Sequence, residues 1–231
     1  MISATPNGLP EKIQRLKKRL QLPLPGETIR ATMLPLPESG DEINRPALRD
    51  DHRKAAVLFL LYPVITSDST DKPAQTSENL HLVFIQRPDY DGTHSGQISL
   101  PGGRHEGDET LEQTALRESF EEVGVDPQQV TILGELDPMN VFASNHNVYP
   151  FIGYCPSRPK FVPCQQEVAA IIEAPIATLL KPTSRLTELR DLKRWGPTHV
   201  PFYSVDDHKI WGATAIMLAE FLHLLTECFN E

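Results

Sequence analysis

One stretch of the chain, from Gly103 to Val125, constrains the fold more than any other part of the sequence. Thr110 and Gln113 have the spacing of a capping box, in which each side chain bonds a backbone amide at the start of a helix. Gly124 can adopt the left-handed conformation that ends a helix. The pattern therefore predicts a helix that begins near Thr110 and ends at Gly124.

This helix would carry two different faces when wound at about 100° per residue. The largely apolar face would consist of Ala115, Leu116, Ser119, Phe120 and Val123, and the polar face of Thr114, Arg117, Glu118, Glu121 and Glu122. The three glutamates stand at i, i+3 and i+4, where like charges repel by about 0.2–0.5 kcal/mol per pair on an exposed helix. A hard divalent cation would offset this repulsion, because Mg²⁺ takes carboxylate oxygens and keeps waters for a phosphate substrate. A solvated acidic face is the alternative interpretation.

The flanks of the helix extend this pattern. Pro101-Gly102-Gly103 precedes an acidic loop, Glu109 follows Gly103 by six residues, and Arg117-Glu118 follows eight residues later. The spacing G-x5-E-x7-R-E-x-x-E-E-x-G resembles the Nudix box of the Nudix hydrolase family, with every fixed letter present. Ser119 stands where the family usually has an apolar residue.

The resemblance implies a hydrolase of phosphoric anhydrides that depends on Mg²⁺ or Mn²⁺. It implies an α/β fold of the Nudix type, an α/β/α sandwich with a mixed sheet. The implied metal ligands are Glu118, Glu122, Glu121 directly or through water, and the Gly102 carbonyl; the implied structural residues of the box are Gly103, Glu109, Arg117 and Gly124. Arg117 would pair with Glu109. The general base remains open between Glu121, Glu118 and Glu167.

A second resemblance precedes the box. The stretch from Val83 to Gly103 is similar to the extra motif of the coenzyme A pyrophosphatase branch of the same family. The spacing is kept at Arg87, Gly96, Pro101, Gly102 and Gly103, and the residue types depart at Pro88, Gly92 and Leu100. Glu167-Val-Ala-Ala and Ile210-Trp-Gly-Ala-Thr-Ala215 are similar to the same branch, so that the resemblance spans roughly Arg53 to the end of the chain.

The branch implies cleavage of coenzyme A or an acyl-CoA into 3′,5′-ADP and 4′-phosphopantetheine. Two other functions stay open: hydrolysis of another nucleoside diphosphate derivative, such as ADP-ribose or a dinucleotide, and a Nudix-fold ligand sensor without catalysis. Arg87 and Arg104 flank the glycine turn and could fork onto phosphate oxygens, although each could also form a surface salt bridge. His94 is a further candidate for substrate contact, whereas His105 and His146 are interpreted as loop residues.

The remaining elements follow from short apolar runs. We expect strands at 55–62, 81–87, 97–100, 130–136, 148–154 and 167–172, a helical turn at 175–180, a hairpin at 199–211 and an apolar helix over 212–229. The segment 66–79 is expected to be a flexible surface loop. Strands on both sides of a central helix imply a mixed sheet between helices.

The chain before Arg53 is expected to divide from the rest, giving residues 1–52 as an N-terminal helix and extended linker and 53–231 as the hydrolase domain. Ile13, Leu16 and Leu20 form one helical stripe among lysines and arginines, which favours a helix docked on its own domain over a membrane-surface helix or part of an organelle transit peptide. The Pro-rich segment 21–51 fits a linker.

Composition limits the partners of the chain. A formal net charge of −9 argues against nucleic acid or an anionic membrane as the main partner. The family resemblance implies a small-molecule nucleoside diphosphate as the partner. No apolar run was long enough to predict a membrane span. Three cysteines without a C-x-x-C pair, and no signal-peptide pattern, indicate a cytoplasmic protein. The oligomeric state stays open, including a homodimer.

Overall fold

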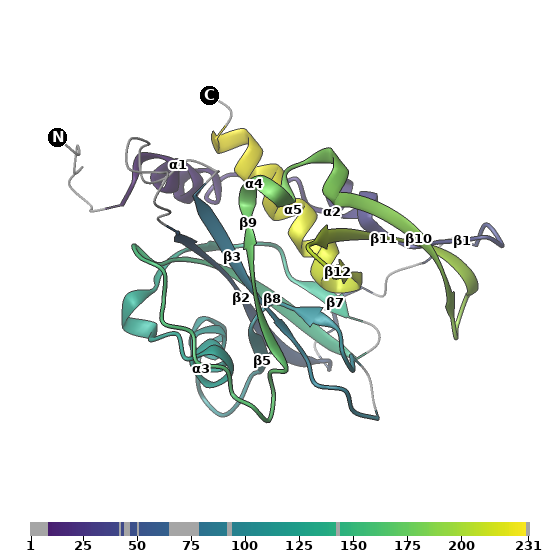
Figure 1. Cartoon of the computed structure of the whole chain (residues 1–231), viewed down its shortest axis with the longest axis horizontal. Coiled ribbons are helices and arrows are strands. Elements are labelled where there is room, and N and C mark those ends of the chain that lie inside the picture. The colour runs from purple at the N-terminus through teal and green to yellow at the C-terminus, as the bar shows by residue number, and fades with distance from the viewer. Residues whose placement is uncertain are drawn as a thin grey trace.

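The computed structural model describes residues 9–41, 43, 47–49, 51–64, 79–91, 94–141 and 144–229. Its helices lie on both faces of a mixed sheet, with α3 (Leu111–Val123) on one side and α1 (Glu11–Arg19) and α5 (Gly212–Phe229) on the other (Figure 1). This arrangement confirms the predicted α/β/α sandwich. The segment 66–78, expected as a flexible loop, lies outside the described residues, as does Gly92.

The larger sheet has the order β4-β3-β2-β8-β6, with β5, β7 and β9 paired to β2, β8 and β3. Its strands are β2 (Arg53–Pro63), β3 (Leu80–Gln86), β4 (Ile98–Ser99), β5 (Gly102–Arg104), β6 (Thr131–Glu135), β7 (Met139–Val141), β8 (His146–Tyr154) and β9 (Ala170–Pro175). The central pair β2 and β8 is parallel over nine residue pairs, from Arg53↔His146 to Leu61↔Tyr154, and the other pairings are antiparallel. The sheet is therefore mixed, as expected.

A smaller antiparallel sheet lies beside the first. It consists of β1 (Leu36–Pro37), β10 (Arg185–Leu192), β11 (Gly196–Val205) and β12 (His208–Trp211). The predicted hairpin over 199–211 corresponds to β11 and β12, but β10 and β1 were missed. The short helix α4 (Ile176–Leu179) and a 3₁₀ turn (Pro182–Ser184) connect the two sheets. In Figure 1 this smaller sheet extends past the start of α5.

Strand β2 is buried on both faces, because its alternate side chains enter two different cores. Phe59 and Leu61 join the core beneath α5, where the Phe59 and Phe221 rings stack with centroids 4.7 Å apart. Leu58 and Leu60 join the core beneath α3. A continuous apolar run is therefore the correct signature for this strand, rather than an alternating one.

Helix α3 has the predicted ends. Gln113 N donates to Thr110 Oγ1 at 3.2 Å, Thr110 N donates to Gln113 Oε1 at 2.7 Å, and Gly124 ends the helix at φ 74°. The predicted faces need correction. Phe120, expected in the core, is 54 % exposed, whereas Glu122, expected on the polar face, is 3 % exposed. The buried face of α3 therefore includes Glu122, because its carboxylate accepts a hydrogen bond from the backbone amide of Gly102.

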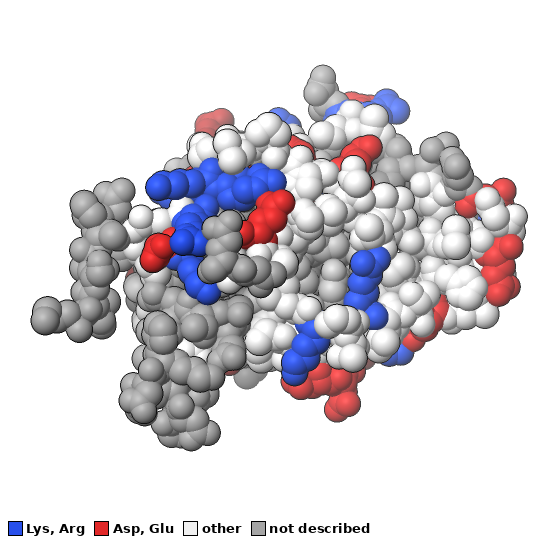
Figure 2. Space-filling model, turned by 90° about the horizontal axis from the view of Figure 1, so that it is seen from above, with Lys and Arg blue, Asp and Glu red and all other residues white. Residues whose placement is uncertain are grey.

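The N-terminal helix docks on the rest of the molecule. Ile13 and Leu16 are fully buried in the core beneath α5, and Arg19 Nε pairs with Glu227 Oε2 at 2.6 Å. Its cationic side chains face outward, and Figure 2 shows Lys and Arg gathered on the side of the molecule where α1 lies. The predicted docked helix is therefore present.

The segment expected as an extended linker contains short elements, namely α2 (Gly26–Arg30), a 3₁₀ turn (Ala31–Met33) and β1. A buried ion pair anchors it, because Arg30 Nε lies 2.5 Å from Glu220 Oε2 while Gly26 N donates to Glu220 Oε1 at 3.1 Å. Arg30 also donates to the carbonyls of Asp137 and Pro138. The N-terminal segment is therefore part of the core of the molecule.

Helix α5 has the predicted bounds. By length and mean hydropathy, 1.3 over 18 residues, it could cross a membrane, a match that was not expected from the sequence. However, 72 % of this stretch is buried inside the molecule, as in the core helix of a globular protein. Every residue from Thr214 to Leu222 is buried.

Candidate active site

Helix α3 and the glycine turn meet in a close backbone contact. Gly102 N donates to Glu122 Oε2 at 2.8 Å, and β5, which carries Gly102 and Gly103, pairs with β2. A Cβ on Gly103 would lie 2.4 Å from the Glu118 carboxylate carbon, closer than any side chain allows. Glycine at this position therefore lets the helix bring Glu118 and Glu122 against the turn.

Arg117 joins the loop before the helix to the glutamates on it. Its guanidinium donates to both oxygens of Glu109 at 2.9 Å each, in the bidentate geometry that suits a carboxylate. It also donates to Glu118 Oε1 at 3.0 Å, to Glu121 Oε2 at 2.8 Å and to the Arg104 carbonyl at 3.0 Å. The adjacent guanidinium lowers the pKa of Glu109 to about 2. Arg117 thus fixes the loop relative to two of the three glutamates.

The carboxylates of Glu118 and Glu122 at this turn have raised pKa values, because the positive charges beside them do not offset their burial. The pKa of Glu122 is raised to about 7, mainly by burial; the Gly102 amide and Arg87 lower it, and the charges of Glu118 and Glu167 raise it. Burial likewise raises the pKa of Glu118. Arg87 Nη2 lies 4.0 Å from Glu122 Oε1, too far for a hydrogen bond. A carboxylate cluster with this imbalance fits a divalent cation.

The acidic residues predicted for the site do not all converge. In the part of the chain that the structure describes, no group of three His, Cys, Asp or Glu side chains has metal-binding geometry. Glu121 is half exposed and paired with Arg117. Glu167 is exposed and lies in a turn before β9, not in the strand predicted for it, yet close enough to influence the pKa of Glu118 and of Glu122. Two carboxylates and the glycine turn therefore form the centre of the site, which suits Mg²⁺, an ion that keeps several waters.

A cavity of about 620 Å³ opens beside the glycine turn. Its charged lining consists of Arg53, Arg87, Arg104 and Arg194 together with His94 and His146. Among the described residues that line it, none is Asp or Glu, although the whole chain has 31 acidic and 22 basic residues. The cavity is therefore suited to an anionic ligand. This size lies in the usual range of small-molecule sites.

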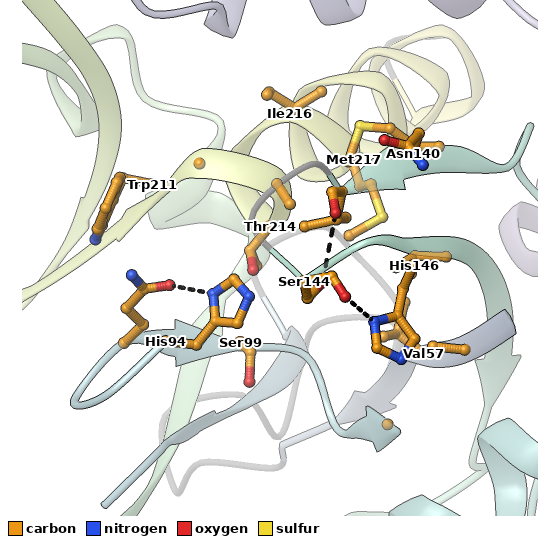
Figure 3. Close-up of a pocket in the computed structure, with 18 of the residues that line it drawn as sticks. Val57, His94, Ser99, Asn140, Ser144, His146, Trp211, Thr214, Ile216 and Met217 are labelled. Atoms are coloured by element: carbon orange, nitrogen blue, oxygen red, sulfur yellow. Dashed lines mark hydrogen bonds between the residues drawn. The ribbon is translucent and has the colours of Figure 1, made fainter. Parts of the chain in front are cut away.

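Side chains from distant elements form the cavity walls (Figure 3). His94 has a positive φ of 68°, and its Nδ1 lies 2.9 Å from Gln97 Oε1. Met217 of α5 and Asn140 of β7 lie on the opposite side in the same view. Trp195, in the turn between β10 and β11, and Trp211, at the end of β12, are both partly exposed and also line the cavity.

The structure thus brings Arg87, Arg104 and His94, the three predicted substrate contacts, to one cavity next to Gly102 and Gly103. Sequence analysis missed the contributions of Arg194 and Trp195, because β10 and its turn were not predicted. It also missed Asn140, which resembles an ordinary strand residue, whereas Thr214 belongs to the stretch from Ile210 to Ala215 that was matched to the coenzyme A branch without a role for this residue. The branch-like stretch from Ile210 to Ala215 and the tryptophan at position 195 are the signals in the sequence that point to this wall.

Comparisons with known proteins agree with this geometry. Residues 73–196 match the NUDIX domain. Nudix hydrolase 3 of Caenorhabditis elegans is 30 % identical over 197 residues, which cover 78 % of this chain and 78 % of that protein. The Nudix hydrolase NudL of Yersinia pestis is 35 % identical over 169 residues, covering 72 % of this chain and 77 % of that protein. A MutT/nudix family protein from Enterococcus faecalis has a similar fold, with a TM-score of 0.52 at 13 % identity over 95 % of this chain and 76 % of that one.

Proposed function

Because the chain belongs to the Nudix hydrolase family, whose members act on phosphoric anhydrides, we propose that it cleaves coenzyme A or an acyl-CoA. The pyrophosphate would be cut into 3′,5′-ADP and (acyl-)4′-phosphopantetheine. The sequence support is the spacing from Arg87 to Gly103 and the two further stretches at Glu167 and Trp211 that are similar to the coenzyme A branch.

The cavity carries this proposal. Coenzyme A has a pyrophosphate and a separate phosphate monoester, so its binding site must neutralise more charge than a site for ADP-ribose. Four arginines and no acidic residue line the described part of the cavity beside the glycine turn. Arg87 and Arg104 are the proposed contacts to the pyrophosphate, because they lie at the turn itself, and His94 is a third proposed contact.

Glu118, Glu122 and the Gly102 carbonyl are the proposed ligands of Mg²⁺ or Mn²⁺, with Glu121 acting directly or through water. When bound, such an ion neutralises charge on the phosphoryl oxygens and makes the attacking water more acidic. The protein positions its own groups for this step. Arg117 holds Glu118 in place, and the Gly102 amide holds Glu122.

Glu167 is the proposed general base. The other two candidates, Glu121 and Glu118, both accept a hydrogen bond from Arg117 Nη1, which occupies an oxygen of each. Glu167 has no ion-pair partner among the residues that the structure describes. It is exposed on a turn beside Glu118 and Glu122, where it could take the proton of an attacking water.

A substrate panel tests the proposed function. Purified protein with Mg²⁺ is incubated with coenzyme A, ADP-ribose, NADH and diadenosine polyphosphates, and the products are identified by chromatography. We expect the highest kcat/KM for coenzyme A, complete loss of turnover after exhaustive chelation, and recovery with Mg²⁺ or Mn²⁺. Brisk hydrolysis of ADP-ribose without turnover of coenzyme A would refute the substrate assignment and leave the hydrolase family unchanged.

A further inference from the structure

The first turn of α5 opens directly onto the cavity. Trp211, Gly212, Ala213 and Thr214 all line it, so the amino end of an 18-residue helix faces the ligand space. Gly212 has a φ of 63°, and a Cβ placed there would meet no atom within 4 Å. The space in front of the helix is therefore open, and the amides of its first turn have no helical carbonyl to bond.

The positive end of α5 has no acidic residue in its own first turn. No side chain in the described part of the chain is bonded to this turn as a cap. The partial positive charge of a helix amino end attracts anions. By contrast, α3 has Thr110 as a cap and Glu112 in its first turn, so its amino end is already satisfied.

Thr214 gives an independent indication of a ligand. Its side chain is 8 % exposed, and its hydroxyl has no hydrogen-bond partner among the described residues. In Figure 3 the Thr214 hydroxyl points from the helix toward the cavity, on the side where His94 lies. The residue as a whole is largely buried, and its hydroxyl oxygen remains accessible from the cavity. Such a group at an uncapped helix end, in a cavity with arginines, suits a ligand oxygen.

This position differs from the proposed pyrophosphate site. The pyrophosphate is assigned to the glycine turn of β5, in the larger sheet, whereas α5 begins at the end of β12, in the smaller sheet. Both border the same cavity of about 620 Å³. A ligand with two separate anionic groups could therefore occupy both places at once.

We propose that the first turn of α5, with the Thr214 hydroxyl, binds a phosphate monoester of the substrate that is separate from the pyrophosphate. This inference rests on the proposed function, in which the 3′-phosphate of coenzyme A is that group. The amides of the turn and the hydroxyl donate to the phosphate oxygens, and the arginines of the cavity supply the opposite charge. Thr214 is thus a determinant of specificity for a nucleotide with a second phosphate.

Binding of two nucleotides tests the inference without turnover. Adenosine 3′,5′-bisphosphate and adenosine 5′-monophosphate differ by one phosphate monoester, and their Kd values are measured by calorimetry on the full chain with Mg²⁺. We expect the bisphosphate to bind the unmodified protein at least tenfold more tightly. In Thr214→Val, which keeps the branched shape and loses only the hydroxyl, this ratio should fall by about tenfold, because a hydrogen bond to a charged group is worth about 1.5–3 kcal/mol.

Thr226→Val is the matched control. Thr226 lies on the same helix, and its Oγ1 donates to the Leu222 carbonyl at 2.9 Å, away from the cavity. It should leave the ratio of Kd values unchanged, and both variants should unfold at nearly the temperature of the unmodified protein. An unchanged ratio in folded Thr214→Val would overturn the inference, as would equal binding of the two nucleotides by the unmodified protein.

Kinetics distinguish failure of this inference from failure of the proposed function. The kcat/KM of coenzyme A relative to dephospho-coenzyme A should also fall about tenfold in Thr214→Val. If neither compound is hydrolysed but the bisphosphate preference depends on Thr214, the proposed function is wrong and the phosphate site stands. If both compounds are hydrolysed at equal rates by the unmodified protein, the hydrolase assignment stands and the phosphate site does not.

Discussion

Glu122 shows a conflict between stability and function at a single residue. Its carboxylate is 3 % exposed, accepts one backbone amide and faces the charges of Glu118 and Glu167. The raised pKa means that the folded protein without metal favours the neutral acid, whereas the unfolded chain ionises at its ordinary value of 4.5. The native state therefore becomes less stable as the pH rises from about 4.5 through about 7.

We predict that Glu122→Gln abolishes this pH dependence and most of the activity. In the presence of chelator, the variant should be more stable than the unmodified protein above pH 7, by a difference on the order of 3 kcal/mol, and equally stable near pH 4. The amide keeps an acceptor for Gly102 but cannot hold a divalent cation well, so kcat with Mg²⁺ should fall at least ~100-fold. Urea titrations at several pH values and steady-state kinetics measure both effects. Full activity in the variant would exclude Glu122 as a ligand.

Glu167→Gln is expected to act on the chemical step alone. Because the side chain is exposed on a turn, its loss should leave the unfolding temperature within a degree or two, as for most surface substitutions. As the proposed base, it should lower kcat by about 10²–10⁴ with little change in KM. Glu121→Gln serves as the comparison, since that carboxylate is paired with Arg117. A larger loss of kcat in Glu121→Gln than in Glu167→Gln would move the base to α3.

At the scale of elements, one side chain holds the acidic loop against α3. Arg117 bonds Glu109, Glu118, Glu121 and the Arg104 carbonyl. We predict that Arg117→Ala lowers both activity and the free energy of unfolding, the latter by about 1–3 kcal/mol, because Glu109 is left partly buried without its charged partner.

Thermal unfolding and kcat/KM, measured on the same preparations, check this prediction. Arg15→Ala is the control, since Arg15 forms an exposed i,i+4 pair with Glu11 on α1 and pairs of this kind contribute little. A fully stable and active Arg117→Ala variant would show that the loop holds its position without the guanidinium.

The ends of α3 could be read from the sequence, because a capping box and a terminal glycine act locally. Its faces could not. Phe120 is exposed and Glu122 is buried because a distant glycine turn presents an amide to the carboxylate, and no helical pattern contains that contact. Strand β10 was missed for a similar reason. Its side chains are mostly exposed, so pairing with β11 rather than an apolar face makes it a strand.

The residues that line the cavity could also be predicted only in part from the sequence. Arg87, Arg104 and His94 were predicted because they flank the glycine turn in the sequence. Arg194 reaches the same cavity only through the smaller sheet, and the branch-like stretch that contains Thr214 did not indicate that this residue would face Arg87 and Arg104 across one cavity. Tertiary contacts of this kind depend on the whole fold, and spacing along the chain carries no trace of them.

At the scale of the whole molecule, the two ends of the chain form one core. Leu16 of α1 is fully buried beneath α5, and a buried ion pair joins Arg30 of α2 to Glu220 of α5. We predict that Leu16→Ala destabilises the entire protein by about 2–5 kcal/mol, the usual cost of emptying a core position.

Urea unfolding followed by both fluorescence and circular dichroism measures this cost, and the two probes should give coincident transitions. Leu22→Ala is the matched control, because Leu22 is 59 % exposed and its truncation should change the free energy of unfolding by less than about 0.5 kcal/mol. An early separate transition in Leu16→Ala would show that the N-terminal segment unfolds on its own, as the proposed division at residue 52 allows.

The joining of the two chain ends has a consequence for biosynthesis. Helix α1 begins at Glu11 and α5 at Gly212, so at about 5–20 residues per second a ribosome completes the first roughly 10–40 s before the second. A nine-residue helix is not stable alone in water, and its apolar stripe has no partner during that interval. A nascent chain that lacks only its last helix therefore cannot close the core. Until α5 has left the exit tunnel, this part of the core stays open, and exposed apolar surface of this kind makes a nascent chain prone to aggregation.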